Sequence, residues 1–352
     1  MVILLLITYL TRPKSFKHIF SVRAVDYYLL TSIYYLLSGS QHLWKTLTIP
    51  YQYQIRYCAE IATMETTKEI SALFTLIDDP DEEVFGLVSN KIVDFGKVII
   101  PNLEHLWETT PDEATQQRIE LLIHRLHYSD LTEDFRQWSL AGHHDLMLGA
   151  MLTAKFQYPD LATAQVMQEL EKVRRNIWLE LNNYLTPLEQ INVVTSILYS
   201  YYGLKGGETN YKEPNEFLLN KILEAKRGNQ VGNGILYLVL CELLDIPIKA
   251  IAIPKQFIVA YFKPGYSEEN LLDPRQKIEF FIDPTSGQVF THADVDSYFK
   301  RIAIAPTGAN FKPRRNKEVI GSLLDEFGKC FDNDKDRYKQ KELLEIIRII
   351  TE

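Results

Sequence analysis

The stretch Lys226-Arg-Gly-Asn-Gln-Val-Gly-Asn-Gly-Ile-Leu-Tyr-Leu238 decides the fold. It passes from a polar, glycine-rich turn into a run that is apolar on nearly every side, which predicts a buried helix that begins at Gln230. Four β-rich runs follow at 248–253, 256–262, 279–282 and 288–290. A buried helix followed by antiparallel strands indicates an α+β core.

Helical periodicity surrounds this core on both sides. Apolar residues recur at helical spacing from 65 to about 183, and Thr186-Pro-Leu-Glu189 is a capping box that opens a helix to about Tyr202. An acidic turn at 78–81 resembles that of a HEAT-type hairpin, but a solenoid needs several stacked copies and the chain has one. The remaining helices are expected at 112–128, 131–140, 145–158, 160–183, 292–301, 318–331 and 337–351.

These patterns divide the chain into four predicted parts. Residues 1–63 are expected to be an extension outside the folded domain, with Met64 as the true start, and 64–183 to be an all-helical region. Residues 184–306 are expected to form the α+β core with a small antiparallel sheet, and 307–352 a C-terminal helical pair. For the extension, an alternative is a membrane-contacting segment at 25–37, because apolar stretches rich in Tyr favour bilayer interfaces.

Composition limits the partners and the compartment. The formal charge is −8 and no dense Lys/Arg run occurs, which argues against nucleic acid or an anionic membrane as a partner of the folded domain. Cys58, Cys241 and Cys330 lie far apart without Cys-x-x-Cys spacing, so neither a disulfide framework nor a zinc site is predicted. We therefore expect a cytoplasmic protein with no cofactor and no metal, and with a protein or peptide as its partner.

The start of the buried helix is a place where cysteine chemistry would be favourable. A cysteine hydrolase places its thiol at a helix N-terminus, where the free amides stabilise the thiolate, beside a His that a carboxylate orients. Here Gln230 occupies the helix start, Gln256 the head of the second strand run, and Asp283 the end of the third. A carboxamide is a very weak nucleophile and base, so this pair cannot perform acyl transfer by that route.

Seven short segments of the chain together have a familiar pattern. They are Asp145-Leu-Met-Leu-Gly-Ala-Met-Leu152, Tyr158-Pro-Asp-Leu161, Thr186-Pro-Leu-Glu189, Arg227-Gly-Asn229, Gly234-Ile-Leu-Tyr-Leu238, Pro254-Lys-Gln-Phe257 and Ile282-Asp-Pro284. Together they resemble the SirB-type transglutaminase-like family, a branch of the papain-like cysteine hydrolases. The resemblance extends from about Leu140 to Arg301, and more loosely upstream to Met64. It implies a papain-like α+β core after an all-helical region, often followed by a helical-repeat pair.

This sequence departs from the family's triad at two positions. Where the full pattern reads Asn-Cys the chain reads Asn229-Gln230, and where it reads Pro-x-His-Phe the chain reads Pro254-Lys-Gln256-Phe257. Asp283 matches the third member. The resemblance therefore implies the architecture of a Cys-His-Asp enzyme without its nucleophile and its base.

No other residue has a strong claim to replace them. Cys241 comes eleven residues after Gln230, on nearly the same helix face but about 16 Å along the axis, and it reads as a packing residue. Glu120, His124 and His127 have the spacing of metal ligands on one helix, although a solvated helix edge is the simpler interpretation. His292 follows the last strand and has a small claim to approach Gln256 and Asp283, but Thr291-His-Ala-Asp294 reads as a helix cap.

The leading hypothesis is a non-catalytic transglutaminase-like protein, a pseudoenzyme whose former groove is lined by Asn229, Gln230, Gln256 and Asp283. This groove is either structural or binds a peptide or an amide-bearing ligand, because carboxamides donate and accept hydrogen bonds at once. One alternative is a hydrolase or acyltransferase with a non-standard site around Asp283, using a water or His292. Another is an interaction scaffold built on the helical half, residues 65–183.

Overall fold

The computed structural model describes residues 68–263, 273–334 and 336–352. The predicted extension 1–63, the start at Met64 and the membrane alternative at 25–37 lie outside these residues. The chain divides into two compact units, Met1–Val88 and Ser89–Glu352, which are described separately. In the first, residues 68–74 are helical and helix α4 (Glu82–Asp94) begins; α4 continues into the second.

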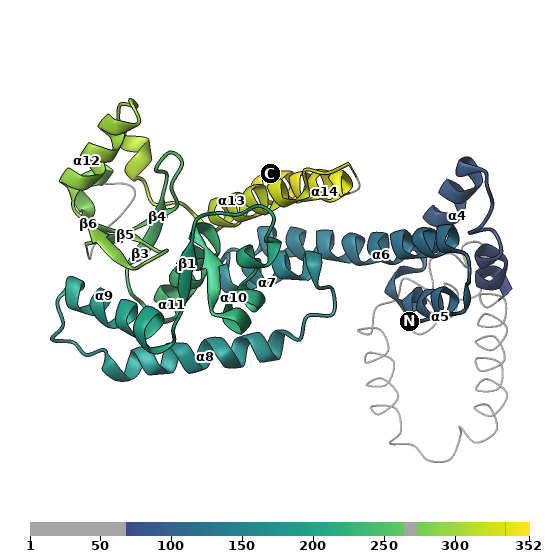
Figure 1. The fold of residues 1–352 in the computed structure, drawn as a ribbon, viewed down its shortest axis with the longest axis horizontal. Helices are drawn as coiled ribbons and strands as arrows, with labels where there is room; N and C mark the ends of the chain where they lie inside the picture. The colour runs from purple at the N-terminus through teal and green to yellow at the C-terminus, as the bar shows by residue number, and fades with distance from the viewer. Residues whose placement is uncertain (1–67, 264–272, 335) are drawn as a thin grey trace, which may run out of the picture. The chain divides into compact units, whose positions relative to one another are not determined.

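The second unit is mostly helical and contains a small sheet that lies beside α12 (His292–Arg301) (Figure 1). Its α-helices after α4 are α5 (Ile100–Thr109), α6 (Glu113–Leu140), α7 (Leu146–Gln157), α8 (Thr163–Glu180), α9 (Pro187–Thr195), α10 (Leu219–Ala225), α11 (Gln230–Leu243), α12 (His292–Arg301), α13 (Asn316–Gly328) and α14 (Arg337–Thr351). Within the described residues, no helix is both long and apolar enough to cross a membrane.

The strands form two separate sheets. A four-stranded antiparallel meander contains β3 (Ile248–Ile251), β4 (Ile258–Phe262), β5 (Ile278–Asp283) and β6 (Gln288–Phe290) in that order. A short parallel pair joins β1 (Lys205–Gly207) to β2 (Arg227–Asn229), with Gly207 opposite Asn229. Because α11 begins directly after β2, this pair fixes where the first residue of α11 lies.

The meander is covered on both faces. Along β4, alternate residues face opposite sides of a strand, and Val259 and Tyr261 join the large core around α11, whereas Ile258, Ala260 and Phe262 join a smaller cluster with α12. β4 is therefore buried along its whole length. This fixes the head of β4 against the start of α11.

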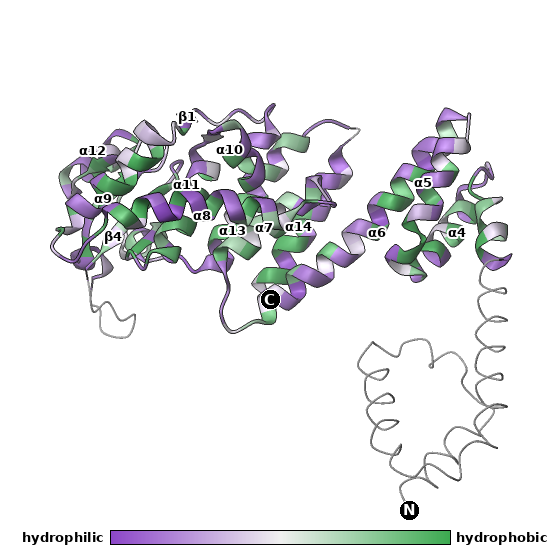
Figure 2. Ribbon diagram, turned by 90° about the horizontal axis from the view of Figure 1, so that it is seen from below, coloured by the Kyte–Doolittle hydropathy of each residue, from purple (hydrophilic) through white to green (hydrophobic). Residues whose placement is uncertain are grey.

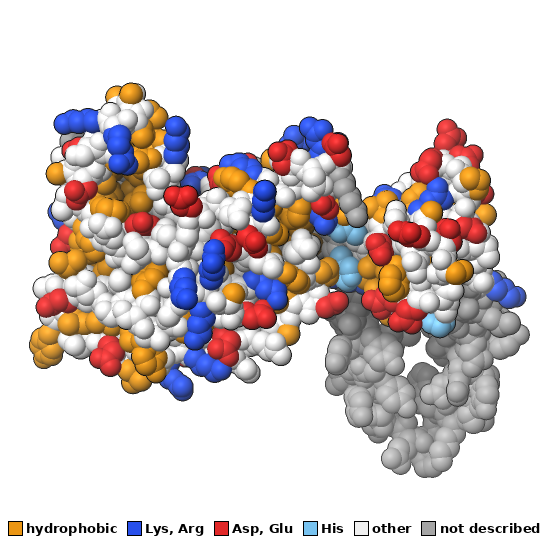
Figure 3. Space-filling model, viewed as in Figure 1, with side chains coloured by type: hydrophobic (Ala, Val, Ile, Leu, Met, Phe, Trp, Pro, Cys, Tyr) orange, Lys and Arg blue, Asp and Glu red, His pale blue; other side chains and the backbone are white. Residues whose placement is uncertain are grey.

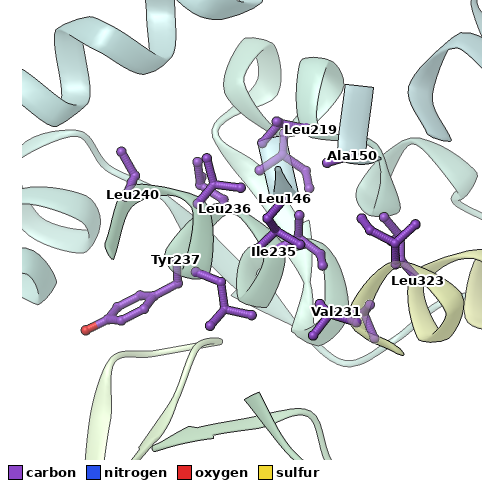
Figure 4. Packing of buried hydrophobic residues seen from close by; sticks show 14 of the residues in the cluster. Leu146, Ala150, Leu219, Val231, Ile235, Leu236, Tyr237, Leu240 and Leu323 are labelled. Carbon is purple, nitrogen blue, oxygen red and sulfur yellow. The ribbon is translucent and has the colours of Figure 1, made fainter. Parts of the chain in front are cut away.

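Helix α11 is the centre of the large core. Its residues from Val231 to Cys241 are all buried, and Figure 4 shows Leu146, Ala150, Leu219 and Leu323 gathered around Ile235 and Val231, while Tyr237 points to another side. By contrast, α8 carries both hydrophobic and hydrophilic residues (Figure 2), as expected for a helix that turns one face to the core. A helix surrounded in this way cannot shift without repacking several neighbours.

The expected α+β class is confirmed, with helices before a small antiparallel sheet and helices after it. Two local interpretations of the sequence were wrong. The helices expected at 112–128 and 131–140 are the single helix α6, because no Gly or Pro separates them. Gly203, Gly206 and Gly207 indicate a loop in the sequence, but Lys205–Gly207 form β1. The helix expected to run to about Tyr202 extends to Tyr201, and its last part, Ser196–Tyr201, is π-helical.

Candidate functional site

Gln230 is the first residue of α11, and its position is set by a side-chain cap. The Oδ1 atom of Asn229 accepts a hydrogen bond from the Gly232 amide at 2.9 Å. Asn229 is fully buried, and its Nδ2 has no hydrogen-bond partner among the described residues. Capping by a buried Asn fixes the first turn of α11, so Gln230 is held at a defined point on the surface.

Gln256 lies in the tight turn that leads into β4. Lys255 has a left-handed backbone with φ 61°, and the Gln256 amide donates to the Ile253 carbonyl at 3.3 Å. The ring of the next residue, Phe257, lies against α11 at Gly234, where a Cβ would lie 2.3 Å from the ring. Gly234 thus permits the close approach that brings Gln256 beside the start of α11.

The two glutamines meet directly. The Nε2 atom of Gln230 donates to Oε1 of Gln256 at 2.6 Å, and this contact lies at the surface. Each amide keeps unused capacity, namely both N–H groups of Gln256 and the carbonyl oxygen of Gln230, since the described residues offer them no other hydrogen bond. The pair can therefore accept a hydrogen bond from a ligand and donate one to it.

Asp283 ends β5 and is half-buried. Its Oδ1 accepts from the Thr285 amide at 2.8 Å, so part of the carboxylate is used within its own turn. Val259 pairs with Ile282, which places Asp283 opposite Ile258, two residues from Gln256. No hydrogen bond joins Asp283 to Gln256 in the described part of the chain, so the three predicted site residues lie near one another but only two are bonded.

Neither cysteine in the described residues can take the place of a catalytic nucleophile. Cys241 is fully buried, and burial raises the pKa of its thiol well above the ordinary value. Cys330 is partly buried, and burial raises the pKa of its thiol to about 12. Because the thiolate is the reactive form, neither side chain is an activated nucleophile.

His292 is engaged in a structural network. Its Nδ1 accepts from Nε of Arg275 at 3.3 Å, and its Nε2 lies 3.0 Å from the Ile278 carbonyl. An arginine only donates, so Nδ1 carries no proton and Nε2 donates to the carbonyl. With both ring nitrogens occupied and the ring against Phe281, His292 is not placed to act on Gln256 or Asp283.

The candidate metal ligands on α6 have separate partners. Glu120 accepts from the Trp107 indole at 3.0 Å, and His124 lies 2.8 Å from Glu342 of α14. Among the described residues, no group of three His, Cys, Asp or Glu side chains is arranged to hold a metal ion. The edge of α6 at His124 is covered by α14, where a solvated edge was expected.

The surface near β1 carries both charges. Lys and Arg side chains gather over β1, α10 and α8 (Figure 3), and several are paired with neighbouring acids: Lys172 with Glu169, Lys221 with Glu224 and Arg227 with Glu216. The Arg227 pair, at 2.7 Å, lies only three residues before Gln230. This face therefore does not form a uniformly basic surface.

Sequence reasoning missed the residues that support the turn after Asp283. Tyr199 and Thr195 approach this turn from α9 and the π-helical segment. A π-helical bond has no sequence signature, and the only available signal was Gly287, which ends the turn with φ 74°.

The comparisons with known proteins agree with this architecture. Residues 164–325 match the family model of the transglutaminase-like superfamily. Protein SirB1 of Salmonella typhimurium is 23% identical over 181 residues, which is 50% of this chain and 63% of SirB1. The UPF0162 protein YchA of Escherichia coli is 24% identical over the same shares, and a UPF0162 protein of Xylella fastidiosa is 28% identical over 118 residues, 32% of this chain and 41% of that protein. The chain thus spans less than two thirds of these relatives, and no solved structure matches it.

Proposed function

We propose that the chain is a non-catalytic transglutaminase-like protein whose former active-site groove binds a peptide or another amide-bearing ligand. The proposal is supported by the match of residues 164–325 to the family model of the transglutaminase-like superfamily and by the similarity to SirB1. The groove is lined by Gln230, Gln256 and Asp283, while Asn229, also expected there from the sequence, is fully buried and caps the helix that begins at Gln230. The predicted cytoplasmic location and the boundaries at 183/184 and 306/307 belong to the same proposal.

One observation carries it, the surface hydrogen bond of 2.6 Å between Gln230 and Gln256. Two carboxamides that served only to satisfy each other in the core would be buried, whereas Gln256 is exposed. Their remaining donors and acceptor match those of a peptide group or a side-chain amide, which also offers one of each. A carboxamide pair suits recognition and lacks the ionisable groups that acyl transfer needs.

The experiment is a titration followed by nitrogen-15 NMR on the full chain. The probe is a capped glutamine peptide, acetyl-glycyl-glutaminyl-glycinamide, and the signals are the side-chain amides of Gln230 and Gln256, assigned by single Gln→Ala substitutions. We expect these two signals to shift together and to saturate. Unchanged signals up to millimolar peptide would contradict the proposal.

A remaining catalytic alternative is Asp283 acting with a water molecule. It is tested by incubating the protein with peptide amide, ester and isopeptide substrates beside an Asp283→Ala variant. We expect equal background from both proteins. Turnover that disappears in Asp283→Ala would replace the binding proposal with an enzyme.

A further inference from the structure

Hydrogen bonds and packing contacts hold the turn from Asp283 to Gly287 on several sides. Within it, the Asp283 carbonyl accepts from the Gly287 amide at 2.7 Å. The Tyr199 hydroxyl donates to the Pro284 carbonyl at 2.5 Å. Thr195 closes the far end, since a Cβ on Gly287 would lie 2.4 Å from its Cγ2. On the β1 side, Gly206 packs against the Thr285 carbonyl.

Tyr199 comes from an unusual piece of backbone, and Thr195 is the last residue of α9 before it. Helix α9 changes after Thr195 into the π-helical segment Ser196–Tyr201, whose Tyr202 amide bonds to the Ile197 carbonyl at 2.7 Å. π-Helical turns are rare, and they recur at functional sites because the extra residue re-aims the side chains of one turn. Here the segment directs Tyr199 at the carbonyl that follows Asp283.

We propose that Tyr199 is a positioning residue: through the Pro284 carbonyl, and with Thr195 at the far end of the turn, it holds the Asp283 carboxylate beside the head of β4, where Gln256 lies. This inference rests on the proposed function, because it assigns the support of Asp283 to a groove that is in use. It adds Tyr199 and Thr195 to the residues that determine how a ligand is held.

The electrostatics of the buried hydroxyl agree with this role. Burial, and then the nearby Asp283 carboxylate, raise the pKa of Tyr199 well above its ordinary value. A raised pKa keeps the phenol protonated throughout the physiological range, so it remains a hydrogen-bond donor to Pro284. The support is therefore permanent and does not switch with pH.

The test introduces a Cys-His pair, whose ionisation can be measured, at the positions of Gln230 and Gln256 in the full chain. In a Gln230→Cys and Gln256→His background, an Asp283 carboxylate in working position orients the introduced imidazole, and the resulting imidazolium lowers the pKa of the introduced thiol. The rate constant of alkylation by iodoacetamide is measured from pH 5 to 9. The unsubstituted chain, treated in the same way, gives the background of Cys58, Cys241 and Cys330.

In this background Tyr199→Phe removes only the hydroxyl and keeps the ring. We expect its alkylation rate at pH 6 to fall about tenfold toward that of an Asp283→Asn variant, which corresponds to a thiol pKa about one unit higher. At pH 9, where the thiol is ionised in every variant, the rates should agree. The matched control is Tyr202→Phe, whose hydroxyl bonds to the Leu223 carbonyl at 2.8 Å, away from the turn, and it should stay within twofold of the parent.

Three outcomes would overturn the inference. Tyr199→Phe could leave the pH dependence of the alkylation rate as it is in the Gln230→Cys, Gln256→His protein. It could lower the rate equally at all pH values. The Gln230→Cys, Gln256→His protein itself could react no faster at pH 6 than a free thiol. If Tyr199→Phe does not fold, Thr195→Ser takes its place, because it removes only the methyl group against Gly287, and an unchanged profile would again overturn the inference. Peptide binding by the unsubstituted chain is a separate measurement. If the peptide does not bind, the proposed function is refuted, but the pH dependence of alkylation is unaffected.

Discussion

The chemistry of the groove is decided by single side chains. Gln230 and Gln256, which the sequence predicts to take the places of a Cys-His pair, form one hydrogen bond and keep further donors and an acceptor. The sequence predicted that Gln230, Gln256 and Asp283 form one site, and the structure joins the first two by a hydrogen bond. It could not predict that Asp283 would bond to Thr285 in its own turn, because this depends on turn geometry.

At this scale Gly234→Ala tests how the two glutamines are brought together. A Cβ at this position would overlap the Phe257 ring at 2.3 Å, and overpacking of this kind costs about 1–3 kcal/mol. We expect the free energy of unfolding in urea to fall by that amount. Gly142→Ala is the control, since a Cβ there meets nothing within 4 Å; an equal loss in both variants would contradict the explanation.

At the scale of elements, caps determine where the helices begin. The sequence predicted Thr186 as the cap of α9 and Thr291 as the cap of α12, and the structure contains both capping boxes. It failed where one element depends on another, as in β1, whose Gly206 and Gly207 read as a loop but pair with β2. Parallel pairing of distant residues has no local signal.

The α12 cap predicts a pH effect on stability. Hydrogen bonds from the side chain and the backbone of Thr291 hold the pKa of Asp294 below its ordinary value of 3.8. Because the folded pKa is the lower one, the cap stabilises fully above the ordinary value and loses its contribution as the pH falls through the lower one. The urea midpoint of Asp294→Asn should therefore fall less than that of the unsubstituted chain between pH 5 and pH 2. Parallel curves would contradict this assignment.

At the scale of the second unit, the C-terminal helices belong to the same hydrophobic core as α11. Leu343, Ile346 and Ile350 of α14 are buried in that core, and Tyr128 of α6 bonds to Glu345 at 2.9 Å. The sequence predicted these helices from their apolar periodicity. Periodicity identifies the buried face of a helix but not the element it packs against, so the contact between α14 and α6 could not be predicted.

This packing predicts that α14 unfolds together with the core. Ile346 is 0% exposed and Leu344 is 44% exposed on the same helix. Ile346→Ala should lower the free energy of unfolding by about 2–5 kcal/mol, through lost burial and the cavity that remains, whereas Leu344→Ala should change it by less than 1 kcal/mol or so. The measurement is urea unfolding followed by tryptophan fluorescence and circular dichroism. Two separate transitions would show that the C-terminal helices fold on their own.

The central claim is that the groove recognises an amide ligand through its two carboxamides. Its most direct test is the dissociation constant of acetyl-glycyl-glutaminyl-glycinamide for the unsubstituted chain, Gln256→Ala and Gln165→Ala, with the melting temperature of each. Gln165 is exposed on α8 and serves as the matched control. We predict that Gln256→Ala weakens binding at least about tenfold, the effect of losing roughly 1.4 kcal/mol of hydrogen bonding, with an unchanged melting temperature. Equal affinity in all three proteins, or loss of the fold in Gln256→Ala, would contradict the account.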